Sequence, residues 1–232
     1  MTIREIAGTL RSRDVMFNVL SHVFIDVPDD YADKMIGETA DLIAGIAETT
    51  ENEDFKEGFA LLSGYFSVKG PSISECLSET RLERSLAFTS LFILGGQWSQ
   101  SVYESVHRSA EKLLKQEPWS EVKAFYQQNG FSCSEEKNIS EDHIAMELQF
   151  MGLLSGKAAV ACEREDFGAC EELLGTQHRF YEEHISKWIP GLCTKIAECK
   201  DKTDYAFYAA YALILKGFIA EDMLFLKELL AD

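Results

Sequence analysis

The sequence predicts an all-α protein, and three observations lead to this prediction. Apolar residues recur at helical spacing along most of the 232 residues, no alternating apolar–polar run of useful strand length appears, and only four prolines interrupt the chain. A helix needs an apolar stripe that repeats about every 3.6 residues, and it tolerates proline poorly beyond its first turn. We therefore expect one domain over residues 1–232, a bundle of about ten or more helices around a single core.

The first four helices are indicated by their apolar faces and by their caps. In the first helix, four apolar residues follow one another at steps of seven, three and four: Leu10, Phe17, Leu20 and Phe24. Asp29 is a suitable N-cap for a second helix over roughly 29–48. A third helix ends at Gly70-Pro71, and a fourth ends at Gly95-Gly96. The apolar positions that define these two faces are Phe55, Phe59, Leu62, Phe66, Leu82, Leu86, Leu91 and Phe92.

The middle of the chain is expected to hold two helices and then a linker. The first helix starts near Ser101 and carries four apolar residues: Val102, Val106, Leu113 and Leu114. Pro118 fits the first turn of the second helix, because a proline there forfeits no helical hydrogen bond. Residues 127–140 then lose the apolar period, so we expect a flexible linker, and a hinge, at this point. Ser140 is a natural N-cap for the following helix, which would place Asp142 in its first turn, where negative charge is favoured.

The C-terminal third is predicted to be helical throughout. Helical patterns cover 167–187, 189–199 and 204–215, and a last helix ends at Leu230. The segment from Tyr205 to Leu215 is apolar on nearly all sides, so it should form a central buried helix.

Charge and composition narrow the class of partner. The chain has 22 Lys and Arg against 39 Asp and Glu, a formal net charge of -17. Such a surface repels nucleic acid but attracts a basic peptide or protein. The six cysteines form no C-x-x-C pair, the N-terminus has no apolar signal-peptide core, and no segment is apolar enough to span a membrane. On charge alone, the simpler interpretation is that the acidity keeps the protein soluble. We therefore expect a cytoplasmic protein that binds no nucleic acid.

The residues that could carry chemistry do not form a complete catalytic or metal site. Glu104 and His107 make one Glu-x-x-His motif, and a di-metal site would need a second. His143 and Glu147 share a helix face and could ligate a metal, but a third ligand is not apparent. There is no nucleophile elbow and no glycine-rich phosphate loop. We predict no enzyme activity, no catalytic residue, no metal and no cofactor. A helical metal- or haem-binding enzyme and a generic interaction adaptor remain open as alternatives.

Several short segments, taken in order, resemble a known family. They are Leu91-Phe92 with Gly95-Gly96, the run 101–106, Tyr126 to Gly130, the helix opening 141–151, and Phe180, His184, Trp188 and Pro190. In this order and spacing they are similar to the TorD/DmsD family of redox enzyme maturation chaperones, which is related to NarJ. One departure is Ser140, where the family often has proline before its Asp-His pair.

The resemblance implies a TorD-like fold and a chaperone function. Such a protein binds the twin-arginine leader, the apo catalytic subunit, or both, of a molybdopterin-containing oxidoreductase, and assists cofactor insertion and proofreading before export. A leader has a basic segment followed by an apolar one, which an acidic protein with an apolar groove would attract and bury. We place that groove along Phe88, Leu91, Phe92 and Tyr103, near Asp142 and His143. The full set of leader- or client-binding residues expected is Phe88, Leu91, Phe92, Tyr103, Glu104, Ser105, Asp142, His143 and Glu147. An ordinary core or capping role is the alternative for each, and both a monomer and a domain-swapped homodimer fit a hinged chain.

Overall fold

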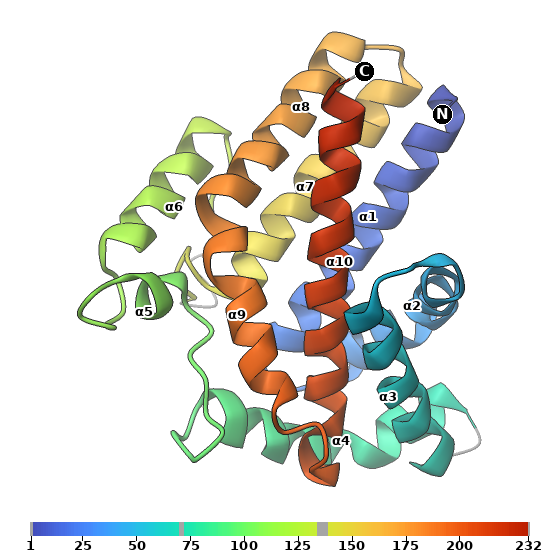
Figure 1. Ribbon diagram of the computed structural model, residues 1–232, viewed down its shortest axis with the longest axis vertical. Coiled ribbons are helices and arrows are strands. Elements are labelled where there is room, and N and C mark those ends of the chain that lie inside the picture. The colour runs from blue at the N-terminus through green and yellow to red at the C-terminus, as the bar shows by residue number, and fades with distance from the viewer. Residues whose placement is uncertain (1, 70–71, 134–138, 232) are drawn as a thin grey trace. The chain divides into compact units, whose positions relative to one another are not determined.

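The computed structural model describes residues 2–69, 72–133 and 139–231, and most of these residues are helical (Figure 1). The helices are α1 (Ile3–Ile25), α2 (Asp30–Thr49), α3 (Glu53–Lys69), α4 (Ile73–Phe92), α5 (Glu104–Arg108), α6 (Glu117–Gln128), α7 (Ile144–Glu163), α8 (Phe167–Phe180), α9 (Ser186–Ala197) and α10 (Ala206–Ala231). A π-helical turn, η2 (Tyr181–Ile185), joins α8 to α9, and a 3-10 turn, η3 (Thr203–Tyr205), precedes α10. The all-α prediction is confirmed. Of the predicted linker, residues 134–138 lie outside the described residues.

The chain divides into two compact units. Unit 1 comprises Met1–Ser21, Tyr103–Ile189 and Asp222–Asp232, and unit 2 comprises His22–Val102 and Pro190–Glu221. Three of the boundaries fall inside α1, α9 and α10, so each of these helices contributes residues to both units.

In unit 1, a buried polar network joins helices that are distant in sequence. The Arg13 guanidinium of α1 donates to Asp222 of α10 (Nη2–Oδ2, 2.9 Å) and to Gln177 of α8 (2.8 Å). It also donates to Ser155 of α7 (3.1 Å), and the Tyr181 hydroxyl donates to Asp222 (2.7 Å). Charged groups out of water need this degree of pairing, so the network fixes how these helices pack.

In unit 2, the first half of α10 is the central buried helix that the sequence predicts. Every residue from Phe207 to Leu215 is at most 4% exposed. Two glycines allow α3 and α10 to approach closely: a Cβ at Gly58 would lie 2.7 Å from the Ala210 carbonyl oxygen, and one at Gly217 would lie 2.7 Å from the Phe55 amide. The two helices expected over 204–215 and up to Leu230 are in fact one continuous helix.

Two expectations about apolar faces are wrong. Leu82 and Leu86 do not pack into the core but are 73% and 64% exposed, because α4 instead turns inward a face that includes Arg84, whose guanidinium pairs with Asp33 of α2 at 2.7 Å. The helix expected from Ser101 shrinks to the five residues of α5, and Leu113 and Leu114 lie exposed beyond its end. Lys112 and Lys115, on either side of them, have positive φ, which a continuing helix does not allow.

Candidate functional site

The candidate site lies in unit 1, where the segment before α5 meets the segment before α7. Tyr103 and His143 form an isolated antiparallel β-bridge, and the Glu104 amide donates to the Asp142 carbonyl at 2.9 Å. This short pairing brings six of the predicted residues into one region: Tyr103, Glu104, Ser105, Asp142, His143 and Glu147.

Asp142 is buried and caps α5. Its Oδ2 accepts a hydrogen bond from the Ser105 amide at 3.0 Å, and its Oδ1 accepts one from the Ser140 hydroxyl at 2.8 Å. The sequence-based placement of Ser140 as N-cap and Asp142 in the first turn of α7 is therefore wrong. Asp142 instead bonds α5, because the orphan amides at the start of that helix offer a charge-assisted hydrogen bond, and Ser140 supports Asp142.

His143 is the true N-cap of α7, and it is buried, not at the surface. Its Nδ1 accepts a hydrogen bond from the Ala145 amide at 3.1 Å. An imidazole nitrogen accepts only when it carries no proton, so the neutral ring holds its proton on Nε2. Burial lowers the pKa of His143 to about 4, which keeps the ring neutral near pH 7.

Tyr103 is the part of this junction that a partner can reach. Its ring is only half-buried and meets the His143 ring edge-on, with centroids 4.9 Å apart and planes at 83°. Burial raises the pKa of its hydroxyl, with a further contribution from the negative charge of Asp142. The β-bridge and the His143 contact hold this aromatic ring in place, as binding by a surface anchor requires.

The carboxyl groups of Glu104 and Glu147 are both buried at the junction, but they have different hydrogen-bond partners. Glu104 accepts from Arg108 Nη1 at 2.6 Å and lies 3.1 Å from His184 Nδ1. Glu147 accepts from Trp188 Nε1 at 3.1 Å, while its Oε1 has no hydrogen-bond partner among the described residues. Burial, and then the nearby charge of Glu104, raise the pKa of Glu147 well above its usual value, which favours its protonated form.

Sequence reasoning did not assign three of these site residues: Arg108, His184 and Trp188. Arg108 lies four residues after Glu104 on the same helix, and that spacing could have indicated the pair. His184 is 80 residues from Glu104, and it belongs to the π-helical turn η2, where the Ser186 hydroxyl bonds the Tyr181 carbonyl at 2.6 Å. No local pattern predicts such a turn, although π-bulges are frequent at functional sites.

The remaining three predicted residues, Phe88, Leu91 and Phe92, belong to unit 2. Phe88 and Leu91 are buried there, and the rings of Phe88 and Phe92 pack on Tyr208 of α10, with centroids 5.9 and 5.7 Å away. They are part of the packing within this unit, and the groove placed along them stays a prediction.

The arrangement at the junction serves to position side chains. His143 and Glu147 bond to different partners, Ala145 and Trp188, and do not converge. Over residues 2–69, 72–133 and 139–231, no three His, Cys, Asp or Glu side chains are grouped so that they could hold a metal ion. None of the helices in those ranges is both long and apolar enough to cross a bilayer.

Comparison with known proteins gives a family and several relatives. The family model described as nitrate reductase delta subunit matches residues 48–194, which include the whole junction. A protein named chaperone protein TorD from Photobacterium profundum is 26% identical over 201 residues, covering 87% of this chain and 85% of the relative. Proteins of the same name from a Shewanella species and from Aliivibrio fischeri are 27% identical over 164 residues and 26% identical over 189 residues. These matches cover 68% and 82% of this chain, and 72% and 81% of the relatives.

Proposed function

Because the chain belongs to the nitrate reductase delta subunit family, we propose that it is a cytoplasmic chaperone for the catalytic subunit of a molybdopterin-containing oxidoreductase. Its relatives are named TorD chaperones, so the resemblance to the TorD/DmsD family is confirmed, and the prediction that the protein is not an enzyme agrees with those names. In this proposal the client is held through its twin-arginine leader, its apo form, or both, until the cofactor is inserted and export can begin.

The observation that carries the proposal is the junction between Tyr103 and His143. Two segments that resemble the chaperone family in sequence are joined by the β-bridge and by the Asp142–Ser105 hydrogen bond. The buried groups Asp142, His143 and Glu147 fix the backbone, and the half-buried Tyr103 ring is the member of the junction that is partly exposed to a client. We therefore regard Asp142 and His143 as positioning residues that act through Tyr103.

The charge of the protein supports the same class of client. With a formal net charge of -17, the chain attracts a protein segment rich in Arg, and this attraction acts mainly on the rate of association. Short-range contacts with an anchored aromatic ring act mainly on the rate of dissociation. The two contributions can be separated by experiment.

The test uses the full catalytic subunit of a molybdoenzyme from the same organism, purified without cofactor and with its leader intact. Wild-type chaperone should bind this precursor, and added salt should slow association. Tyr103→Ala should speed dissociation by an amount equivalent to about 1 to 3 kcal/mol, as for a buried aromatic anchor. Phe167→Ala is the control, because Phe167 is an aromatic residue that is 53% exposed on α8 and lies outside both the junction and α2. If wild-type protein binds no such precursor in apo form, the chaperone proposal is wrong.

A further inference from the structure

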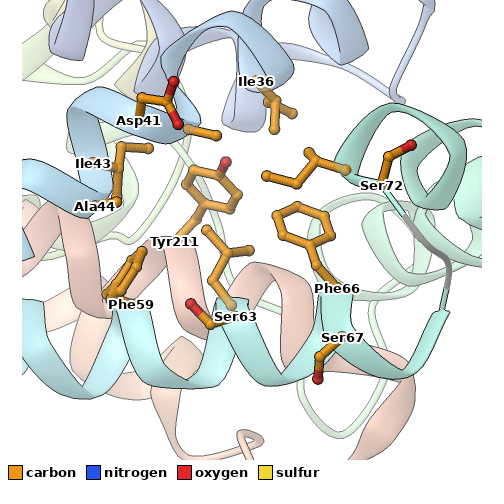
Figure 2. Close-up of a pocket in the computed structure, with 13 residues that line it drawn as sticks. Ile36, Asp41, Ile43, Ala44, Phe59, Ser63, Phe66, Ser67, Ser72 and Tyr211 are labelled. Atoms are coloured by element: carbon orange, nitrogen blue, oxygen red, sulfur yellow. The ribbon is translucent and has the colours of Figure 1, made fainter.

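A second feature, within unit 2, is a pocket of about 380 Å³ between α2 and α3 (Figure 2). Its floor is apolar and buried, and it is formed by Ile36, Ile43, Leu62 and Phe66. Its rim is polar and exposed, and it is formed by Asp41, Ser63, Ser67 and Ser72. A buried apolar centre inside a polar rim is typical of a binding interface, and the volume falls within the usual range for ligand pockets.

The base of the pocket contains an unused hydrogen-bond donor. Tyr211 of α10 is fully buried, and Figure 2 shows its ring among the apolar side chains from α2 and α3. Its hydroxyl has no hydrogen-bond partner among the described residues. Burial raises the pKa of this hydroxyl, so it keeps its proton and can donate. Buried polar groups are normally paired, so an unpaired hydroxyl at the base of a pocket points to a ligand that accepts a hydrogen bond.

The charge around the pocket indicates what kind of ligand would approach. Of the five acidic residues of α2, Asp30 and Asp33 form ion pairs with Arg81 of α4, and Glu38 forms one with Lys34. Asp41 and Glu48 form no ion pair with any described residue, and Asp41 is exposed at the rim. A second copy of this acidic chain would be repelled, and so would an anionic lipid surface. A segment with basic residues beside an apolar stretch would be attracted.

We propose that this pocket binds the apolar segment of the client's leader, with the basic residues that precede it facing Asp41 at the rim. The Tyr211 hydroxyl donates to a backbone carbonyl of the bound segment, whose apolar side chains cover the floor. This inference rests on the proposed function and adds to it a second contact, separate from Tyr103. It also supplies an accessible alternative to the groove expected along Phe88 and Leu91, which are buried.

The experiment is a calorimetric titration with a synthetic leader peptide alone, made from the same client as above. Ala44→Phe places a ring in the pocket that Ala44 lines, and it should weaken peptide binding by about tenfold or more. The matched control is Ala60→Phe, the same substitution at an exposed position of α3 that does not line the pocket, and it should change affinity less than about twofold.

Two conservative variants decide the matter if Ala44→Phe fails to fold. Tyr211→Phe removes only the hydroxyl and should weaken binding by about three- to tenfold. Its control, Tyr126→Phe, removes an equally unpaired buried hydroxyl in unit 1 and should leave binding unchanged. Asp41→Asn should slow association and reduce its salt dependence, whereas Asp201→Asn, an exposed change of the same charge elsewhere in unit 2, should have a smaller effect.

The outcomes separate the two proposals. If the precursor binds but the leader peptide does not, or if the peptide binds equally to wild type, Tyr211→Phe and Asp41→Asn, the pocket assignment is wrong and the chaperone function stands. Self-association that Ala44→Phe abolishes would assign the pocket to a second copy and overturn this inference. If the precursor itself does not bind, the function fails first, and the pocket assignment fails with it.

Discussion

The carboxylate of Asp142 accepts a hydrogen bond from the backbone amide of Ser105 at 3.0 Å, although 37 residues separate the two. Through this bond, the segment that leads into α7 caps α5. The neighbouring β-bridge then places Tyr103 against the His143 ring. The position of the accessible tyrosine thus depends on a carboxylate that is itself fully buried.

We predict that Asp142→Ala lowers the free energy of unfolding by about 1 to 3 kcal/mol, because it leaves the Ser105 amide unpaired in a buried place. Asp142→Asn should lower the free energy of unfolding by less, because the amide oxygen of Asn can still accept a hydrogen bond from the Ser105 amide. Asp166→Ala, which removes the exposed N-cap of α8, is the control and should cost about 1 kcal/mol. Urea unfolding of the three variants measures these differences. A wild-type midpoint for Asp142→Ala would contradict the capping role.

We predict that His143 makes the protein less stable in acid. Its pKa is lowered by burial from 6.5 to about 4, so the folded state excludes a proton that the unfolded state binds. The contribution is present above about pH 6.5 and is lost as the pH falls toward 4, by about 3 kcal/mol in total. Asn at this position can cap α7 but does not titrate. The free energy of unfolding should be measured for wild type and His143→Asn at several pH values. It should fall less in the variant as the pH is lowered. If the two proteins lose the same free energy of unfolding, His143 is not the cause of the acid sensitivity.

We predict the opposite dependence for Glu147. Its pKa is raised by burial and by the charge of Glu104, so its contribution to stability is present at low pH and is lost as the pH rises through the folded-state pKa. Glu147→Gln keeps an acceptor for Trp188 and cannot ionise. The stability of this variant relative to wild type should therefore increase as the pH rises above the ordinary Glu pKa toward the raised folded-state pKa. Glu171→Gln, at an exposed position of α8, should show no comparable gain, and an equal response of both variants would argue against a raised pKa.

We predict that the Arg13–Asp222 pair contributes far more to the free energy of unfolding than the Arg11–Glu163 pair. The side chains of the first pair are 4% and 2% exposed, whereas those of the second are 48% and 47% exposed. Asp222→Ala leaves a buried guanidinium without its counter-charge and should cost about 3 to 5 kcal/mol. Glu163→Ala breaks a surface pair and should cost less than about 1 kcal/mol. Thermal unfolding compares the two directly, and similar losses would show that the buried network does not hold unit 1 together.

The candidate site could be predicted only in part. The resemblance of short segments to a family predicts Tyr103, Asp142 and His143, and the structure brings them together. Their roles are not evident from local rules, which make Ser140 the cap of the next helix. In the structure Asp142 caps α5, Ser140 bonds to Asp142, and His143 takes the capping position of α7. A cap rule considers one helix at a time, so it cannot anticipate a competing amide from another helix.

Local patterns along the chain were enough to predict the all-α class, the start of α2 at its Asp29 cap, the proline in the first turn of α6 and the burial of the first half of α10. These features follow from the spacing of apolar residues and from the chemistry of single residues, which act over one or two turns. Contacts between distant helices, in contrast, leave Leu82 and Leu86 facing solvent, pair Arg13 with Asp222, and place Tyr211 at the base of a pocket. An apolar stripe shows that a helix has an inner face, but the pairing of buried charges across 209 residues depends on which helices meet, and that depends on the whole chain.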